Sequence, residues 1–271
     1  MVSVRGGDTF PARRQGHGLE SRPVLEVRAG GLRPALDLLL HIDHAAPRFV
    51  YDLGCGAGNV TRFLADRWPQ AQVTGVDDST EMLAQATRDV PTVTWVNQNL
   101  DVWAPTVPAD VIYSNAALHW LPQHEDLFPR LFGQLAAGGV LAVQMPDNFQ
   151  APSHTSIADV VRSGPWRHTL EPLLRPNPVG APAFYHRLLA PHAKAVDIWT
   201  TEYLQVLTGP DPVKEWTKGT WLRPFLDALD GAQRADFEAR YAAHVAHAYP
   251  PQQDGKTLFP FRRLFIVVGK A

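Results

Sequence analysis

The segment that most constrains this chain is a glycine-rich turn at residues 50–59, with the sequence V-Y-D-L-G-C-G-A-G-N. A short apolar run at 48–53 predicts a buried strand before the turn, and residues 59–68 predict a helix after it. The turn carries glycine at alternate positions, namely Gly54, Gly56 and Gly58. Because glycine has no side chain, such a turn lets the backbone at a helix N-terminus approach a ligand closely. The segment therefore predicts a ligand site between a strand and a helix.

An acidic residue closes the next predicted strand. Asp77 ends the apolar run at 72–77 and lies 25 residues after Asp52. A carboxylate at the end of the second strand is placed to accept hydrogen bonds from ribose hydroxyls. Together with the glycine turn, Asp77 predicts a cofactor that contains a nucleoside.

The spacing of the glycines distinguishes between cofactors. The dinucleotide pattern G-x-G-x-x-G requires a glycine at position 59, where this chain has Asn59. The pattern D-x-G-x-G-x-G, which begins at Asp52, resembles motif I of class I S-adenosylmethionine-dependent methyltransferases. This resemblance implies that Asp52 helps to hold the amino-acid end of S-adenosylmethionine and that the glycines accommodate its methionine and ribose. The open alternative is a tight turn that binds no ligand.

Composition argues against several other classes of protein. Of the 271 residues, 45% are hydrophobic and 19% are charged, as in ordinary soluble globular proteins. The net charge of −2 gives no reason to expect nucleic acid or a membrane as partner. The single cysteine, Cys55, cannot form an internal disulfide, which is typical of the reducing cytoplasm. A small side chain that fills the turn is a simpler interpretation of Cys55 than a nucleophile, and it is included among the cofactor-binding candidates.

The order of predicted elements is typical of an α/β protein. Strands are expected at 48–53, 72–77, 92–96, 109–114, 139–145, 195–207 and 261–268. Helices are expected at 32–42, 59–68, 79–88, 125–136, 155–162, 211–218 and 222–248, with Gly138 and Gly139 ending the fourth of them. The pattern predicts a Rossmann-like, doubly wound, mostly parallel seven-stranded sheet with a late antiparallel C-terminal strand. We expect residues 1–21 to be a disordered extension, and 22–271 to be one methyltransferase domain with helical cap insertions at about 146–190 and 211–250.

Further cofactor-binding candidates follow the second, third and fourth predicted strands. Asp78 adjoins Asp77, Ser79 is expected to cap the next helix, and Met82 either touches the adenine or packs in the protein. The methyltransferase resemblance implies that Asn99 bonds the adenine amino group and that the backbone at Leu100 lies behind the ring. Many relatives would have Asp at position 99, but Asn also offers an oxygen acceptor. Trp103 either shields the adenine or belongs to the core, and Asn115 is expected near the methionine part of the cofactor.

A more specific resemblance appears further along the chain. It is carried by S-N-A-A-L-H-W-L-P at 114–122, L-F-P-R-L-F-G-Q-L-A-A-G-G-V-L-A-V-Q-M-P-D-N at 127–148, G-P-W-R at 164–167, D-I-W-T-T-E-Y at 197–203, K-G-T-W-L-R-P-F-L at 218–226 and F-P-F-R-R-L-F-I-V at 259–267. These segments, spread over about residues 22–269, resemble trans-aconitate 2-methyltransferases. The segment at 21–29 lacks the Trp or Tyr that relatives use to close over the cofactor.

The resemblance implies methyl transfer to a carboxylate of trans-aconitate or a similar small polycarboxylic acid, giving a monomethyl ester and S-adenosylhomocysteine. A carboxylate with a pKa near 4 is already ionised at pH 7, so no general base and no metal is needed. Carboxylates that are not methylated need cationic or amide partners, most naturally Arg. The candidates for this acceptor site are His119, Trp120, Arg223 and Arg263, with Arg33, Arg167, Gln144 and Tyr185 as further candidates. A protonated His119 would help to hold an acid.

Three other functions remain open from the sequence. The same core could methylate a different small molecule, or the chain could bind the cofactor with little catalysis. A nicotinamide-dependent oxidoreductase is disfavoured by Asn59. In each case we expect a cytoplasmic monomer or homodimer that acts on small molecules.

Overall fold

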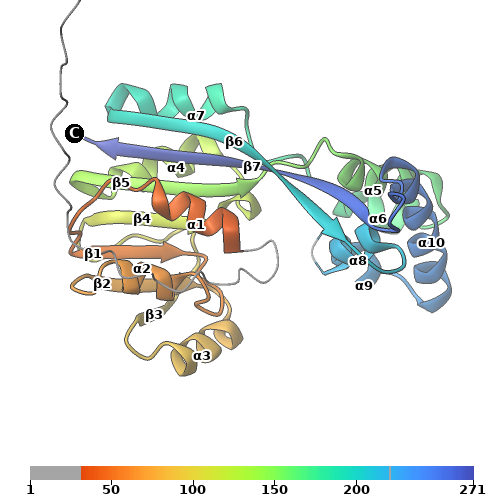
Figure 1. Cartoon of the computed structure of the whole chain (residues 1–271), viewed down its shortest axis with the longest axis horizontal. Helices are drawn as coiled ribbons and strands as arrows, with labels where there is room; N and C mark the ends of the chain where they lie inside the picture. The colour runs from red at the N-terminus through yellow and green to blue at the C-terminus, as the bar shows by residue number, and fades with distance from the viewer. Residues whose placement is uncertain (1–31, 220) are drawn as a thin grey trace, which may run out of the picture.

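The computed structural model describes residues 32–219 and 221–271 of the protein (Figure 1). The predictions of a disordered extension at 1–21 and of an altered closing segment at 21–29 lie outside the described residues. The remaining predictions concern elements that the structure does describe.

The described residues build one seven-stranded sheet in the order β3-β2-β1-β4-β5-β7-β6. Its strands are β1 Phe49–Leu53, β2 Gln72–Asp77, β3 Thr94–Asn97, β4 Ala109–Asn115, β5 Leu135–Pro146, β6 Ala193–Leu207 and β7 Thr257–Lys270. The first five strands pair in parallel, whereas β7 is antiparallel to both β5 and β6. This topology confirms the predicted doubly wound sheet with a late antiparallel strand. The strand order reverses between β1 and β4, which is where sheets of this kind bind ligands.

Helices cover both faces of the sheet. On one face, α1 (Leu32–Leu40) and α2 (Thr61–Arg67) bury apolar side chains such as Leu38 and Leu64 against Val50 and Val111. On the other face, α4 (His124–Gly133) and α7 (Pro182–Leu189) pack over a second apolar cluster that includes Ile112. The helix α3 (Thr80–Asp89) follows β2. The two clusters hold the sheet rigid, so the loops at its carboxyl edge have fixed starting points.

A separate group of helices, called the helical lobe below, lies beyond the ends of the strands on one side of the sheet (Figure 1). It contains α5 (Pro152–Ser163), α6 (Arg167–Leu170), α8 (Pro212–Lys218), α9 (Arg223–Asp227) and α10 (Gly231–Ala248). These helices share an apolar cluster that includes Trp166 and Phe237, and the Tyr241 hydroxyl of α10 donates to the Ser153 carbonyl of α5 at 2.8 Å. The long strands β6 and β7 run from the sheet into the lobe, and the arrow of β1 points toward it.

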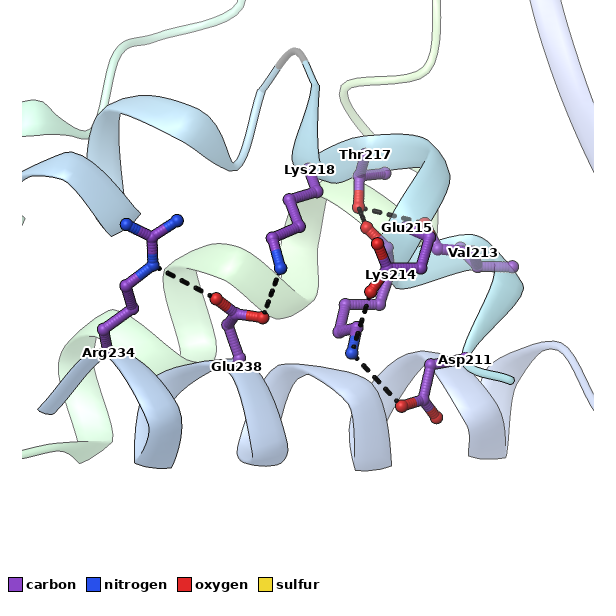
Figure 2. A network of polar contacts seen from close by, with 8 residues as sticks. All are labelled: Asp211, Val213, Lys214, Glu215, Thr217, Lys218, Arg234 and Glu238. Atoms are coloured by element: carbon purple, nitrogen blue, oxygen red, sulfur yellow. Dashed lines mark hydrogen bonds and ion pairs between the residues drawn. The ribbon is translucent and has the colours of Figure 1, made fainter. Parts of the chain in front are cut away.

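The ion pair of Lys218 with Glu238 joins α8 to α10 and belongs to a wider polar network (Figure 2). Glu238 accepts hydrogen bonds from Lys218 Nζ at 2.8 Å and from Arg234 Nε at 3.3 Å. Lys214 pairs with both Asp211 and Glu215. This network lies at the surface of the helical lobe and serves its internal packing.

Two glycines predicted to end a helix lie inside β5, so that prediction is wrong. The helix α4 ends at Gly133, and β5 begins at Leu135. Gly138 has a φ of +75°, and the register between β4 and β5 shifts at this point. A Cβ on Gly139 would lie 2.8 Å from the Ala109 carbonyl oxygen. The two glycines therefore serve an irregular start of β5 that passes close to β4.

The prediction of one long helix at 222–248 is also wrong, because this segment forms two helices. The chain leaves the helix after Asp227 and starts α10 at Gly231. Asp230 caps α10, and its carboxylate accepts a hydrogen bond from Gln233 N at 2.9 Å. An aspartate in that role marks a helix start, which accounts for the break. The last strand begins at Thr257, four residues before the predicted start.

Candidate active site

The glycine turn is pinned to the end of β2 by backbone hydrogen bonds. The amides of Gly54 and Cys55 both donate to the Val76 carbonyl, at 2.8 and 3.1 Å. The amide of Gly56 donates to Asp77 Oδ2 at 2.8 Å. These bonds bring together the two halves of the site that the sequence placed 25 residues apart.

Each glycine of the turn has a positive φ, but only one faces open space. A Cβ on Gly54 would lie 2.1 Å from the Ala117 Cβ, and one on Gly58 would lie 2.6 Å from the ring of Trp95. A Cβ on Gly56 would meet only the Met82 sulfur, at 3.5 Å. Packing within the protein therefore accounts for the outer two glycines. Gly56 is the position where a ligand can approach the backbone, beside a Met82 side chain that is 50% exposed.

Asp77 joins the glycine turn to α3. Its second oxygen, Oδ1, accepts a hydrogen bond from Ser79 N at 2.9 Å. Each carboxylate oxygen keeps a further lone pair for a ligand hydroxyl. Ser79 accepts from Met82 N at 3.3 Å, which confirms it as the cap of α3. Asp78 is exposed, and its carbonyl accepts a hydrogen bond from Asn97 Nδ2 at 3.1 Å, a contact that the sequence did not indicate.

Asp52 and Cys55 are buried beneath the turn. The Asp52 carboxylate accepts a hydrogen bond from Thr61 Oγ1 at 2.6 Å. Burial raises the pKa of Asp52 to about 7, against the opposing effect of the Thr61 bond and with a smaller contribution from the nearby charge of Asp77. Burial also raises the pKa of the Cys55 thiol far above its usual range. A thiol held protonated is a poor nucleophile, so Cys55 fits the role of a small packing residue.

The loop after β3 is fixed by hydrogen bonds from α4. Asn99 is exposed, and its Oδ1 accepts a hydrogen bond from Asp101 N at 2.7 Å. Arg130 donates to the carbonyls of Leu100 and Trp103, at 2.9 and 2.6 Å, and fixes the loop to α4. The sequence did not indicate this role of Arg130. Trp103 is buried in the core under the sheet, so it does not lie open to an adenine ring.

Two polar atoms, at the end of β4 and in the loop after it, are buried without a hydrogen-bond partner among the described residues: Asn115 Oδ1 and His119 Nδ1. Burial is the main cause that lowers the pKa of His119 to about 3, with smaller contributions from the charge of Arg263 and from the neighbouring His124 and His154. The ring is therefore neutral at pH 7, unlike the protonated His119 considered from the sequence. A neutral imidazole still offers one N–H donor and one acceptor.

An aromatic group joins the sheet to the helical lobe. Trp120, which is 45% exposed, stacks on Trp221 of the lobe with ring centroids 4.8 Å apart. Phe149 and His154 lie against Trp221 at 4.9 and 5.5 Å. Cavities of about 630 and 420 Å³ are both lined by Trp120 and Trp221, together with Arg175. These volumes are in the range of small-molecule sites.

The four arginine candidates differ sharply in position. Three are exposed and held in surface ion pairs: the side chains of Arg33, Arg167 and Arg223 are 72%, 55% and 73% exposed and pair with Asp37, Glu171 and Asp227. Arg263 is half-buried, and its Nη1 donates to Gln144 Oε1 at 3.2 Å. Burial lowers the pKa of Arg263 to about 10, so it remains a cation at neutral pH. The structure therefore brings Arg263 together with His119 and separates Arg223 from them.

Tyr185 belongs to the core under the sheet. Its hydroxyl lies 2.7 Å from His124 Nδ1 and accepts a hydrogen bond from Gly180 N at 3.1 Å. These contacts tie α4 to the segment before α7. They explain a buried tyrosine without any role in binding an acceptor.

Comparisons with known proteins show which family this chain is similar to. A family model described as a methyltransferase domain matches residues 50–139. A trans-aconitate 2-methyltransferase from Rhodopseudomonas palustris is 48% identical over 240 residues, covering 88% of this chain and 93% of the relative. One from Azoarcus sp. is 46% identical over 235 residues, covering 87% and 92%.

Among solved structures, the YcgJ protein from Bacillus subtilis superposes with a TM-score of 0.56 at 16% identity, covering 88% of this chain and 97% of that one. This likeness concerns the fold alone. In the part of the chain that is described, no helix has both the length and the apolar character needed to cross a membrane.

Proposed function

Since the chain belongs to the family of trans-aconitate 2-methyltransferases, we propose that it methylates a carboxylate of trans-aconitate, with S-adenosylmethionine as the methyl donor. The single observation that carries the acceptor side of this proposal is the position of Arg263. It is a half-buried cation beside Gln144 and His119, at the edge of the sheet that also holds the glycine turn. A cation in that place suits an acid acceptor better than a neutral or basic one.

The residues proposed to hold the cofactor surround the glycine turn; they are Asp52, Gly54, Cys55, Gly56, Gly58, Asp77, Asp78, Met82, Asn99, Leu100 and Asn115. Asp77 would accept the ribose hydroxyls with its remaining lone pairs, while Gly56 admits the ligand to the backbone. Met82 would cover the adenine with its exposed side chain. When bound, S-adenosylmethionine supplies a methyl group attached to a positively charged sulfur.

The acceptor needs no general base from the protein, because its carboxylates are ionised at neutral pH. The chain therefore contributes position and exclusion of water, which can be worth several kcal/mol or more. Arg263 would hold the acid, and the stacked Trp120 and Trp221 would cover it from the side of the helical lobe. Neutral His119 would donate or accept one hydrogen bond without adding charge.

We further propose that residues 22–271 work as one methyltransferase domain, with the helical lobe as a cap over the cofactor. The lobe contributes Trp221 and His154 to the aromatic group at the edge of the site. The single cysteine supports a cytoplasmic location. We infer a monomer or homodimer that acts on a small acid and not on nucleic acid.

The test is incubation of the purified protein with S-adenosylmethionine carrying a labelled methyl group and with trans-aconitate. We expect label in a base-labile monomethyl ester, together with S-adenosylhomocysteine. Transfer of label to other small molecules but not to trans-aconitate would support the alternative acceptor. Tight binding of S-adenosylhomocysteine without transfer to any acid would show a binding-only relative.

A further inference from the structure

Three polar side chains lie in a row across three neighbouring strands. Asn115, the last residue of β4, pairs with Gln144 of β5, and Arg263 of β7 pairs with Pro146 two residues further along. Side chains alternate between the faces of a strand, so Asn115, Gln144 and Arg263 share the face that α1 and α2 cover. The row thus continues from the edge of β4 toward the helical lobe.

Each member of the row has a buried polar atom without a partner among the described residues. These atoms are Asn115 Oδ1, Gln144 Nε2 and Arg263 Nε. Gln144 is fully buried, and only its oxygen is used, in the bond from Arg263 Nη1. Buried polar groups are normally paired, because an unpaired one loses its bonds to water without compensation. A row of three such atoms indicates a ligand.

The chemistry of the atoms indicates which ligand each one suits. A guanidinium can only donate, so the oxygen of Gln144 must face Arg263 and its NH₂ group must face away. Gln144 and Arg263 therefore present donors, which suit a carboxylate. Asn115 presents an acceptor, which suits an ammonium such as that of the methionine part of the cofactor. The row divides into a cofactor end on β4 and an acid end on β5 and β7.

We propose that Gln144 Nε2 and the Arg263 guanidinium together bind a carboxylate of the acceptor that is not the one methylated. This inference rests on the proposed function. Donors on the reacting carboxylate would draw electron density from it and occupy lone pairs that attack on the methyl group requires. On a neighbouring carboxylate the same donors fix the acid without that penalty. Gln144 is thereby a specificity-determining residue.

The test compares Gln144→Met with the native chain on trans-aconitate and on three dicarboxylic acids. Mesaconate, itaconate and cis-glutaconate each lack a different one of its three carboxylates. The acid that lacks the reacting carboxylate is not methylated. The two remaining acids both keep the reacting carboxylate, and one of them also keeps the carboxylate that Gln144 and Arg263 bind. For this acid, as for trans-aconitate, Gln144→Met should lower kcat/KM by about 10- to 100-fold. The acid without the bound carboxylate should be unaffected, and the KM for S-adenosylmethionine should stay unchanged.

Two further variants guard against a purely structural effect. Gln144→Glu keeps the contact with Arg263 but adds a negative charge, so we expect a larger loss on trans-aconitate than with Gln144→Met. Gln233→Met changes an exposed glutamine of the helical lobe and serves as the matched control, with native kinetics expected.

An equal loss on every methylated acid, or no loss on any of them, would overturn the inference. Activity of Gln144→Glu equal to that of the native chain would also overturn the inference. This measurement tests it even if Gln144→Met fails to fold. Failure of the native chain to methylate trans-aconitate would instead overturn the proposed function, and this inference with it. The two failures are therefore distinguishable in one set of assays.

Discussion

At the scale of single residues, the three glycines of the turn have different structural roles although they share one sequence pattern. Gly58 lies against Trp95, whereas Gly56 has room beside Met82. We expect Gly58→Ala to lower the melting temperature strongly, because the methyl group overlaps a packed ring and the φ of +77° is unfavourable. Gly56→Ala bears only the backbone cost, about 1–2 kcal/mol, and should weaken cofactor binding more than it destabilises the fold.

Thermal unfolding and calorimetry with S-adenosylhomocysteine measure these two effects separately. The interpretation would be wrong if Gly56→Ala unfolded as readily as Gly58→Ala while keeping native affinity. Such a result would mean that the central glycine, too, serves packing.

A second residue-scale prediction concerns Asp52. Its pKa rises from 3.8 in the unfolded chain to about 7 in the folded one, so the folded state retains a proton that the unfolded state releases. The stabilisation from this group is complete below about pH 4 and is lost as pH rises to 7, on the order of 4 kcal/mol in all. Asp52→Asn carries no titrating proton, so its unfolding free energy should lack this decline.

Chemical denaturation of both proteins between pH 4 and 8 gives the comparison. The Asn side chain can still accept the bond from Thr61, which keeps the two proteins matched. Parallel pH profiles for the native chain and Asp52→Asn would show that Asp52 ionises normally.

At the scale of elements, Asp77 connects β2, the glycine turn and α3 through its bonds to Gly56 and Ser79. We expect Asp77→Ala to abolish cofactor binding, since it removes both a ribose partner and the fixed shape of the turn. Asp66→Ala is the matched control, because Asp66 is an exposed aspartate of α2 that is not among the residues proposed to hold the cofactor. Calorimetry measures the affinity of each variant for S-adenosylhomocysteine. Native affinity in Asp77→Ala would refute the assignment of Asp77 as a cofactor-binding residue.

At the scale of the whole molecule, the proposed acceptor site combines residues of the sheet and of the helical lobe. Arg263 and Arg223 were equivalent candidates in the sequence, but the structure separates them: Arg223 lies exposed in the lobe beside Asp227. We expect Arg263→Ala to raise the KM for trans-aconitate at least tenfold, as for loss of a charge-assisted bond, and Arg223→Ala to stay near native. Steady-state kinetics with saturating S-adenosylmethionine test this, and the reverse order would place the acid in the lobe.

The alternation of strands and helices could be predicted because each apolar run is short and bounded by turn residues. The strand Gln72–Asp77 coincides with its predicted range. The wrong predictions of helix ends arose at residue types that occur in more than one structural setting. Gly138 has the positive φ of a helix end but uses it within β5, and Asp230 looks like one more polar residue of a helix although it starts a new one.

The sequence by itself determined where we propose that the cofactor binds, because the glycine turn and Asp77 follow adjacent strands whose order follows from the alternating pattern. Local chemistry and a short connection suffice for that. Only the tertiary structure decided which cation we propose for the acceptor. Arg263 meets Gln144 across 119 residues of chain, through the pairing of β5 with β7. Burial then determines the charge of His119 and which polar atoms have a hydrogen-bond partner. Burial is a property of the packed molecule and not of the local sequence.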